Sequence, residues 1–343
     1  MEENEKRMVG KQSICFQNKV YVRGIASVVG KLEGDGPLGA YFDIVEEDPM
    51  FGGKTWEEAE SKMQQLAAEH AINDAGLKKD QIRVLAGGDL LGQLIATTFG
   101  IETLQIPFLG LYGACSTMGE ALLVTSLLVD GGYAVHAEAI TSSHFAGSEK
   151  QFRFPLAYGN QRPMAATWTV TGSGAVVLSA KRKGYDVIVS AATIGRVVDY
   201  GVKDSMNMGA CMAPAACDTI CRHFEDFGCQ PEDYDAIVTG DLGVVGKEIL
   251  LALVKEKGYD ISKQHMDCGV EIYDSARQGT DSGGSGCGCA AVTLTGYLMR
   301  KLSEGSLQKI LFVPTGALLS TVSFNEGNSV PGIAHAVVLE HIR

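Results

Sequence analysis

The feature that most constrains the fold of this chain is a repeat of its own segments. The run NDAGLKKDQIRVLAGGD at 73–89 aligns without gaps with EDFGCQPEDYDAIVTGD at 225–241, and the alignment pairs Asp89 with Asp241. In both runs an apolar segment follows a turn that contains glycine and ends before an aspartate. A repeat of this kind predicts that the two parts of the chain build the same supersecondary unit.

Two more pairs of segments continue the repeat in the same order. The run CSTMGEALLVTSLLVDGG, from Cys115, matches CAAVTLTGYLMRKLSEGS, from Cys289, and GAVVLSA, from Gly174, matches HAVVLEH, from His335. Three blocks in one order make chance a weak explanation. The first half carries its extra residues after Cys115, within 144–170, and we expect insertions into a repeated core to carry function.

Short apolar runs alternate with segments in which apolar residues recur every three to four positions, which is the pattern of strands and helices in turn. The runs interpreted as strands are RVLAGG, PFLGLYG, AVHAEAI, GAVVLSA, AIVTG, KILFVPTG and AHAVVLE. Because these runs are apolar throughout, both faces of each sheet must be covered. We therefore predict an α/β protein of two similar halves, 1–183 and 184–343, stacked with helices between the sheets.

The charge of the chain excludes several kinds of partner. It has 29 Lys and Arg residues against 41 Asp and Glu residues, and phosphate backbones and anionic lipid surfaces repel the resulting net charge of -12. No nucleic-acid partner is expected. The start MEENEKRMVG lacks the apolar stretch of a signal peptide, and no run has the length and hydrophobicity of a membrane span. Nine scattered cysteines predict reduced thiols in a reducing compartment.

Cys115 lies between an apolar strand and an apolar helical segment. The dipole and free amides at a helix start stabilise a thiolate, so this position suits a nucleophile. The alternative is a small buried side chain at a crowded junction of strand and helix. On that interpretation the helix amides stay available to bind a carboxylate.

The duplicated pattern, with a cysteine at the head of the central helix of the first half, resembles the thiolase-like superfamily of condensing enzymes. Within it the chain is similar to the SpoVAD family of sporulation proteins from Lys11 to Arg343. The runs that carry this resemblance are DGPLG, LAGGDLL, GACST, TSSH, QFRFP, TVTGSGAVV, GSGCGC and TGALLS. The resemblance implies a thiolase-like fold in which two duplicated α/β halves stack as an α/β/α/β/α sandwich.

The resemblance also implies a function. Proteins of this family are expected to bind dipicolinic acid, a pyridine dicarboxylate, and to help load it, with calcium, into the developing spore. The implied partners are other SpoVA proteins of the spore inner membrane, to which the chain would be held peripherally on the forespore side. Relatives of this fold usually pair through the sheet edge beside the nucleophile helix, which leaves a homodimer open.

Catalysis is not expected. In active relatives, as the resemblance implies, a histidine follows the strand that here reads AIVTGDLGVVG, and an asparagine or second histidine lies in the turn that here reads GGSGCGCAA. Neither run contains these residues, and the first offers Asp241 instead. A carboxylate beside a thiol raises the pKa of the thiol by like-charge repulsion. The alternatives are an active condensing or acyl-transfer enzyme that uses Cys115 and a non-binding scaffold of the spore membrane channel.

Dipicolinate is a flat aromatic dianion, so its site needs arginine forks, an aromatic or apolar face and amide donors. The insertion at 144–170 offers such groups close to the carboxyl edge of a strand, where open α/β sheets hold ligands. The predicted ligand-binding residues are Cys115, His144, Arg153, Tyr158 and Arg162. The alternative is that both arginines lie on solvated loops and pair with carboxylates such as Glu149. The sequence does not favour either arginine as the main fork.

No structural metal or cofactor is expected. Cys287 and Cys289 are too close together for a zinc site, and Cys217 and Cys221 share a helix face without a histidine pair. The group at 265–268, which holds a histidine, an aspartate and a cysteine, is expected in a solvent loop. Calcium would enter only as a chelate with dipicolinate, because it takes oxygen ligands. The glycine-rich runs lack the pattern of a phosphate loop, and close packing of the halves explains them.

Overall fold

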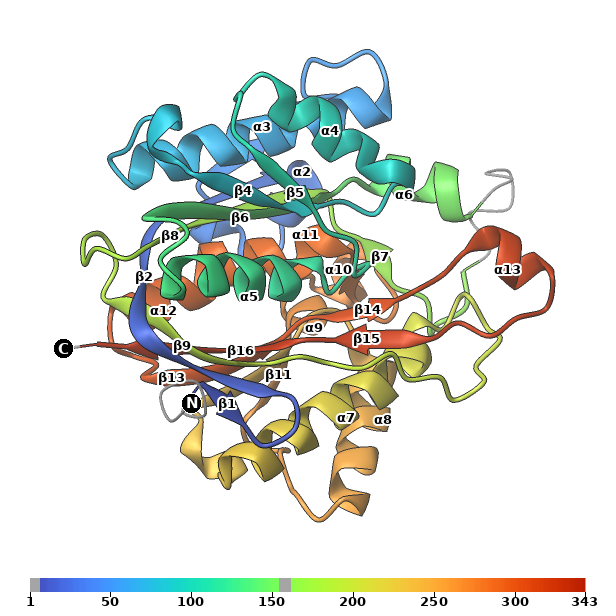
Figure 1. The fold of residues 1–343 in the computed structure, drawn as a ribbon. Coiled ribbons are helices and arrows are strands. Elements are labelled where there is room, and N and C mark those ends of the chain that lie inside the picture. Colours follow the sequence, from blue (N-terminus) through green and yellow to red (C-terminus); the bar gives the residue numbers. More distant parts are fainter. Residues whose placement is uncertain (1–6, 154–161, 343) are drawn as a thin grey trace.

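The computed structural model describes residues 7–153 and 162–342, and its elements form five layers (Figure 1). Two helices cover the outer face of the first sheet, two cover the outer face of the second, and further helices fill the space between the sheets. The first sheet is covered by α3 (Trp56–Asp74) and α4 (Ile95–Glu102), and the second by α7 (Met208–Phe227) and α8 (Gly243–Glu256). The helices between the sheets are α5 (Thr117–Asp130), α11 (Cys287–Val292), the π-helix η6 (Thr293–Leu298) and α12 (Met299–Ser303). The α/β/α/β/α sandwich predicted from the sequence is confirmed.

Each half of the chain builds a sheet with the same strand order. In the first sheet the order is β5 (Phe108–Gly110), β4 (Val84–Gly88), β6 (His136–Ser143), β8 (Gly172–Ser179), β2 (Ser13–Gly30). In the second it is β11 (His265–Asp267), β10 (Ala236–Thr239), β13 (Lys309–Val313), β16 (Ala336–His341), β9 (Val187–Thr193). In both sheets the first three strands are parallel and the last two pairings are antiparallel.

Strand β2 joins the two sheets, because it pairs with β8 along one part and with β9 along another. The five strands of the first sheet and the five of the second therefore form one continuous hydrogen-bonded sheet. The division of the chain at 183/184 stays a prediction, and β2, from the first half in sequence, contributes to both sheets.

The residues that the sequence repeat pairs have matching roles in the structure. Gly76 and Gly228, which follow α3 and α7, both have positive φ, at 62° and 63°, the left-handed conformation in which glycine ends a helix without strain. Asp89 and Asp241 follow β4 and β10 and are fully buried. Asp89 accepts hydrogen bonds from N–H groups of the segment that follows it, at Leu91 and Thr97, whereas Asp241 accepts from the N–H of the distant Gly286. The repeat therefore preserves the position and burial of the aspartate but not its partners.

The expectation that 265–268 forms a solvent loop is wrong. His265 and Asp267 lie in strand β11, and Cys268 begins helix α9 (Cys268–Ile272), all of them buried. Asp267 accepts hydrogen bonds from the N–H groups of Leu242 and Gly243 at the start of α8. A half-exposed strand is recognised by alternating polar and apolar residues. The buried polar residues of this edge strand form hydrogen bonds inside the protein and break that alternation, so the sequence pattern suggested a loop.

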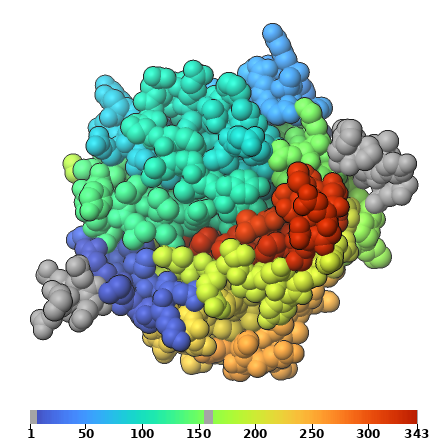
Figure 2. All heavy atoms as spheres, turned by 45° about the vertical axis from the view of Figure 1, so that its right-hand side comes forward, coloured from blue at the N-terminus to red at the C-terminus, as the bar shows by residue number. Residues whose placement is uncertain are grey.

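Short elements complete the chain, and none of the helices in 7–153 and 162–342 has the length and hydrophobicity to cross a membrane. Figure 2 shows the C-terminal segment around α13 (Thr321–Asn325), in red, at the surface directly above the yellow-green residues that precede α7. The other short elements are β1 (Met8–Val9), α2 (Lys31–Gly34), η1 (Gly39–Tyr41), β3 (Ile44–Glu46), η2 (Lys79–Gln81), η3 (Gly92–Leu94), α6 (Phe145–Phe152), β7 (Trp168–Thr169), η5 (Pro231–Asp233), α10 (Ser275–Gln278), β12 (Gly284–Ser285), β14 (Thr315–Ala317) and β15 (Gly332–Ala334).

Candidate functional site

Cys115 lies in the tight turn between β5 and α5. The residue before it, Ala114, has a φ of 50°, an uncommon conformation for a side chain with a Cβ atom. The N–H groups of Ser116 and Thr117 donate to the carbonyl groups of Gly113 and Ala114, both at 3.1 Å. These amides close the turn, so they are not available to a ligand as the sequence interpretation expected.

A cleft opens at Cys115 and takes residues from both halves of the chain. Its empty volume is about 540 Å³, with the solvent at its mouth included. Apolar side chains form most of its wall, namely Leu90, Tyr112, Ala114, Phe152, Met208, Met212, Ala317 and Leu319. Its polar lining is Cys115, Ser148, Glu149, Arg153, Thr169, Asp241, Ser285 and Gly286.

Asp241 of the second half lies beside the Cys115 thiol, close enough for its carboxylate to act on the pKa of that thiol. The N–H of Gly286 donates to Asp241, at 3.0 Å, and it lies within hydrogen-bonding reach of the thiol. Gly286 has a φ of 100°, and a Cβ atom built on it would lie 2.6 Å from Oγ of Ser143. Only glycine can therefore direct this N–H into the cleft.

The surroundings of Cys115 suppress its ionisation. Burial, followed by the negative charge of Asp241, raises the pKa of the thiol well above its ordinary value. Burial also raises the pKa of Asp241, to about 7. The thiol is therefore protonated at neutral pH, and a protonated thiol is a weak nucleophile.

No imidazole is placed to activate this thiol. The seven histidines all fall within the described ranges 7–153 and 162–342, and none of them lines the cleft. The ionisable group that the second half places beside the sulfur is Asp241.

Replacement of Asp241 by Asn is expected to make Cys115 more reactive. The amide keeps an acceptor for Gly286 but removes the negative charge, so the pKa of the thiol falls, although burial still holds it above its ordinary value. We expect Asp241→Asn to be alkylated by iodoacetamide about tenfold faster than the original chain at pH 8, which corresponds to a pKa lower by roughly one unit. Mass spectrometry assigns the label, and a Cys115→Ala, Asp241→Asn double variant is the control. An unchanged rate at Cys115 would contradict this electrostatic coupling.

The two predicted arginines meet at one carboxylate. Arg153 and Arg162 both form ion pairs with Oε1 of Glu149, at 2.9 and 2.7 Å, and both donate to the carbonyl oxygen of Thr167 at 3.2 Å. The side chains are 13, 10 and 7% exposed for Arg153, Arg162 and Glu149. The pairing with Glu149 foreseen by the alternative is present, but these arginines are largely shielded from solvent.

Arg153 and Arg162 differ in their position relative to the cleft. Arg153 lines the cleft, and burial lowers the pKa of its guanidinium. Arg162 does not line the cleft and lies over the stacked rings of Phe145 and Trp168, at 5.4 and 4.7 Å from their centroids. Two guanidinium groups share one carboxylate, so this cluster keeps a net positive charge beside the cleft.

His144 lies near the carboxyl edge of β6, as predicted, but it is not brought together with Cys115. It caps helix α6, where its Nδ1 accepts from the N–H of Ala146 at 3.2 Å, and its Nε2 bonds the carbonyl oxygen of Pro49 at 2.8 Å. It lines a neighbouring cavity together with Trp56 and Trp168. Tyr158, the remaining predicted ligand residue, lies outside the described residues.

Sequence reasoning missed Ser148, which lies on α6 five residues before Arg153. Its Oγ is buried and has no hydrogen-bond partner among the described residues, and the side chain lines the cleft. A buried hydroxyl without a partner costs free energy that a bound acceptor recovers. A serine in the run GSEKQF carries no signal of this role, because its orientation depends on where α6 packs.

Within 7–153 and 162–342, no group of three or more His, Cys, Asp or Glu side chains is arranged to hold a metal ion. Cys217 and Cys221 share one face of α7, as the sequence indicated. Cys287 and Cys289 are buried at the start of α11 and donate to the carbonyl oxygens of Ala114 and Gly240.

Comparison with known families gives one match along nearly the whole chain. The model of the family Stage V sporulation protein AD (SpoVAD) matches residues 10–340. The chain is 44% identical over 334 residues to Stage V sporulation protein AD of Bacillus subtilis (strain 168), which covers 97% of this chain and 98% of that protein.

Solved structures with the same fold are condensing enzymes. Among them is 3-oxoacyl-[acyl-carrier-protein] synthase III from Aquifex aeolicus VF5, with a TM-score of 0.55 and 14% identity over 94% of this chain and 99% of that one. Another is OleA from Xanthomonas campestris, in a variant bound with cerulenin, with a TM-score of 0.62 and 16% identity over 95% of this chain and 97% of that one. At these identities the similarity establishes the thiolase-like fold and leaves the chemistry open.

Proposed function

Because this chain belongs to the Stage V sporulation protein AD family, and therefore serves in sporulation, we propose that it binds dipicolinic acid in the cleft at Cys115. The binding would serve uptake of dipicolinate into the developing spore. The observation that carries the proposal is a buried guanidinium, Arg153, beside an unpartnered hydroxyl, Ser148, on the wall of an otherwise apolar cleft.

The chemistry of the cleft matches a flat aromatic dicarboxylate. Ser148, on α6, and Arg153, directly after α6, both line the cleft and offer donors to a carboxylate. Gly286 also lines the cleft, and its N–H donates to Asp241. Phe152 and the two methionines Met208 and Met212 offer the apolar face that the pyridine ring needs.

The charge of Asp241 affects whether the cleft binds free dipicolinate or its calcium chelate. With a pKa raised to about 7 by burial, its carboxyl is partly neutral at physiological pH and then opposes a dianion less. When ionised it is an oxygen ligand of the kind that calcium takes, so a calcium chelate of dipicolinate could present its metal to this group. The proposal covers both forms, and titration with and without calcium separates them.

We propose that the chain has lost the catalysis of its fold. Support comes from the raised pKa of Cys115, the acidic partner Asp241 and the lack of an imidazole in the cleft lining. The α5 amides that could hold a thioester oxyanion close their own turn instead.

The partners and location are proposed on the same basis. Because the chain belongs to this family, we propose that it acts beside SpoVA proteins at the inner membrane of the forespore. Those proteins would hold the chain at the membrane. A second copy of the chain would pair along β5, the edge strand of its sheet. Leu109 of β5 is exposed there, as are Phe99 and Tyr112.

Calorimetric titration of the pure chain with dipicolinate tests this function. We expect saturable heat with one dipicolinate bound per chain, and we expect no stable mass to be added at Cys115 by acyl-CoA. Acylation of Cys115 would favour the enzyme alternative. If neither dipicolinate nor its calcium chelate produces heat, binding is refuted and the scaffold alternative stands.

A further inference from the structure

Helix α7 carries two thiols that face the same cavity. Cys217 and Cys221 are one helical turn apart, their Sγ atoms are 4.0 Å apart, and they are 5% and 6% exposed. They line a cavity with an empty volume of about 840 Å³ that shares no described lining residue with the cleft at Cys115. Two buried thiols that open onto a cavity are more than small packing residues, because both sulfurs can reach one ligand atom.

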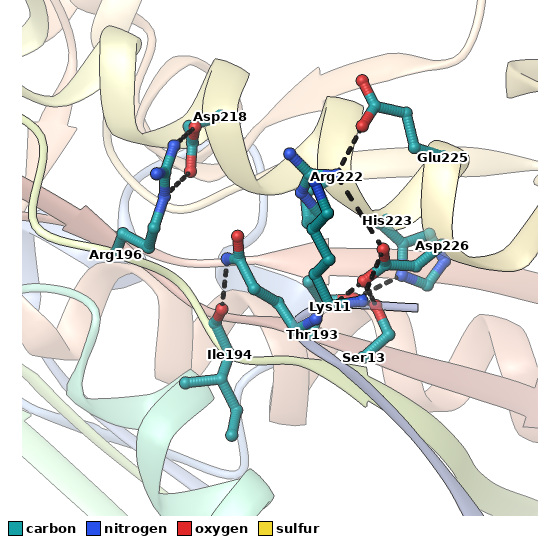
Figure 3. A network of polar contacts seen from close by, with 11 residues as sticks. Lys11, Ser13, Thr193, Ile194, Arg196, Asp218, Arg222, His223, Glu225 and Asp226 are labelled. Carbon is teal, nitrogen blue, oxygen red and sulfur yellow. Dashed lines mark hydrogen bonds and ion pairs between the residues drawn. The ribbon is translucent and has the colours of Figure 1, made fainter. Parts of the chain in front are cut away.

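The charged residues around this cavity are mostly paired (Figure 3). Arg196 forms an ion pair with Asp218, and Arg222 pairs with Glu225 and Asp226. Lys257, which lines the same cavity, has no ion pair with any residue in the described ranges. Lys257 is therefore a cation of the described cavity lining that no ion pair holds in place.

The sulfur spacing suits a shared metal ion. Two sulfurs 4.0 Å apart can both reach one metal ion at bond lengths of about 2.3 Å, and a linear two-coordinate arrangement would need them to move apart by about 0.6 Å. No third His, Cys, Asp or Glu side chain joins the two sulfurs as a ligand group in the described part of the chain. This excludes a tetrahedral zinc site built from side chains there and leaves an ion that accepts few, soft ligands.

We propose that Cys217 and Cys221 form a dithiol site for a soft monovalent metal ion, copper(I). On binding, each thiol releases one proton, two metal–sulfur bonds form, and the oxidation state of the metal does not change. The resulting bis-thiolate complex has a charge of minus one, which Lys257 balances.

Anaerobic titration with copper(I) against a chromogenic copper(I) chelator tests this site. We expect the full chain to hold one ion that Cys217→Ser and Cys221→Ser each weaken by at least ~100-fold, because a single thiolate remains. Cys211→Ser is the matched control, since Cys211 is also a buried cysteine on α7 but does not line the cavity. If the double variant Cys217→Ser, Cys221→Ser keeps the affinity of the Cys211→Ser chain, the proposal is overturned.

Lys257→Glu is a second variant that leaves the thiols and the packing of α7 in place, because Lys257 is exposed. Its reversed charge is expected to weaken copper(I) binding about tenfold. An unchanged affinity would mean that Lys257 does not balance the charge of the complex, and the choice of a monovalent ion would then be wrong. Dipicolinate binding should be equal in all these variants, so failure at this site and failure of the proposed function remain separate results.

Discussion

Arg153→Ala is expected to weaken dipicolinate binding at least ~100-fold. The guanidinium is the buried positive charge on the cleft wall, and the loss of a desolvated charged hydrogen bond costs about 2–5 kcal/mol. Ser148→Ala removes a neutral donor and is expected to cost about tenfold. Calorimetric titration measures both effects.

Lys150→Ala is the matched control for these variants. Lys150 belongs to the same helix, α6, but its ammonium is exposed and paired with Glu57. We expect its dipicolinate affinity to equal that of the original chain. If Lys150→Ala and Arg153→Ala lose affinity to the same degree, general charge attraction rather than a specific fork holds the ligand, and the assignment of Arg153 is wrong.

The second large effect concerns stability. Glu149→Ala is expected to lower the free energy of unfolding by about 3–5 kcal/mol, because it leaves two buried guanidinium groups without their shared carboxylate. The midpoint of urea unfolding, followed by circular dichroism, reports the change.

Glu47→Ala is the control for this variant, since Glu47 forms an exposed ion pair with Lys31 and its loss should change stability by about 0.5 kcal/mol or less. Equal midpoints for Glu149→Ala and Glu47→Ala would mean that the two arginines find other partners or water when Glu149 is absent. The buried cluster would then not be a stabilising feature of the cleft wall.

Much of the fold could be predicted because the signal is local and repeated. Apolar runs such as RVLAGG and KILFVPTG became β4 and β13, and the repeat that pairs Asp89 with Asp241 corresponds to two sheets of the same strand order. The long strand β2 escaped prediction because its N-terminal part, SICFQNKVY, mixes polar and apolar residues. It pairs across both sheets, and such pairing leaves no local pattern.

The site was predicted only in part. The missing imidazole could be read from the sequence, because the run after β10 holds an aspartate and no histidine. The separation of His144 from Cys115 could not, because both residues follow strands of one sheet and only the course of α6 decides which cavity each side chain enters. Ser148 gave no signal, since serine is common on exposed helix faces.

The sequence by itself determined the layered α/β architecture and the repeat, because these follow from periodicity and from which residue types occupy matched positions. Only the tertiary structure decided that Arg153 faces the cleft while Arg162 lies over two aromatic rings, and that Glu149 joins them. Side chains that are close in sequence point to different places when an inserted segment packs against two elements of the fold. Burial and charge decide the direction of each side chain, and both depend on how those elements pack together.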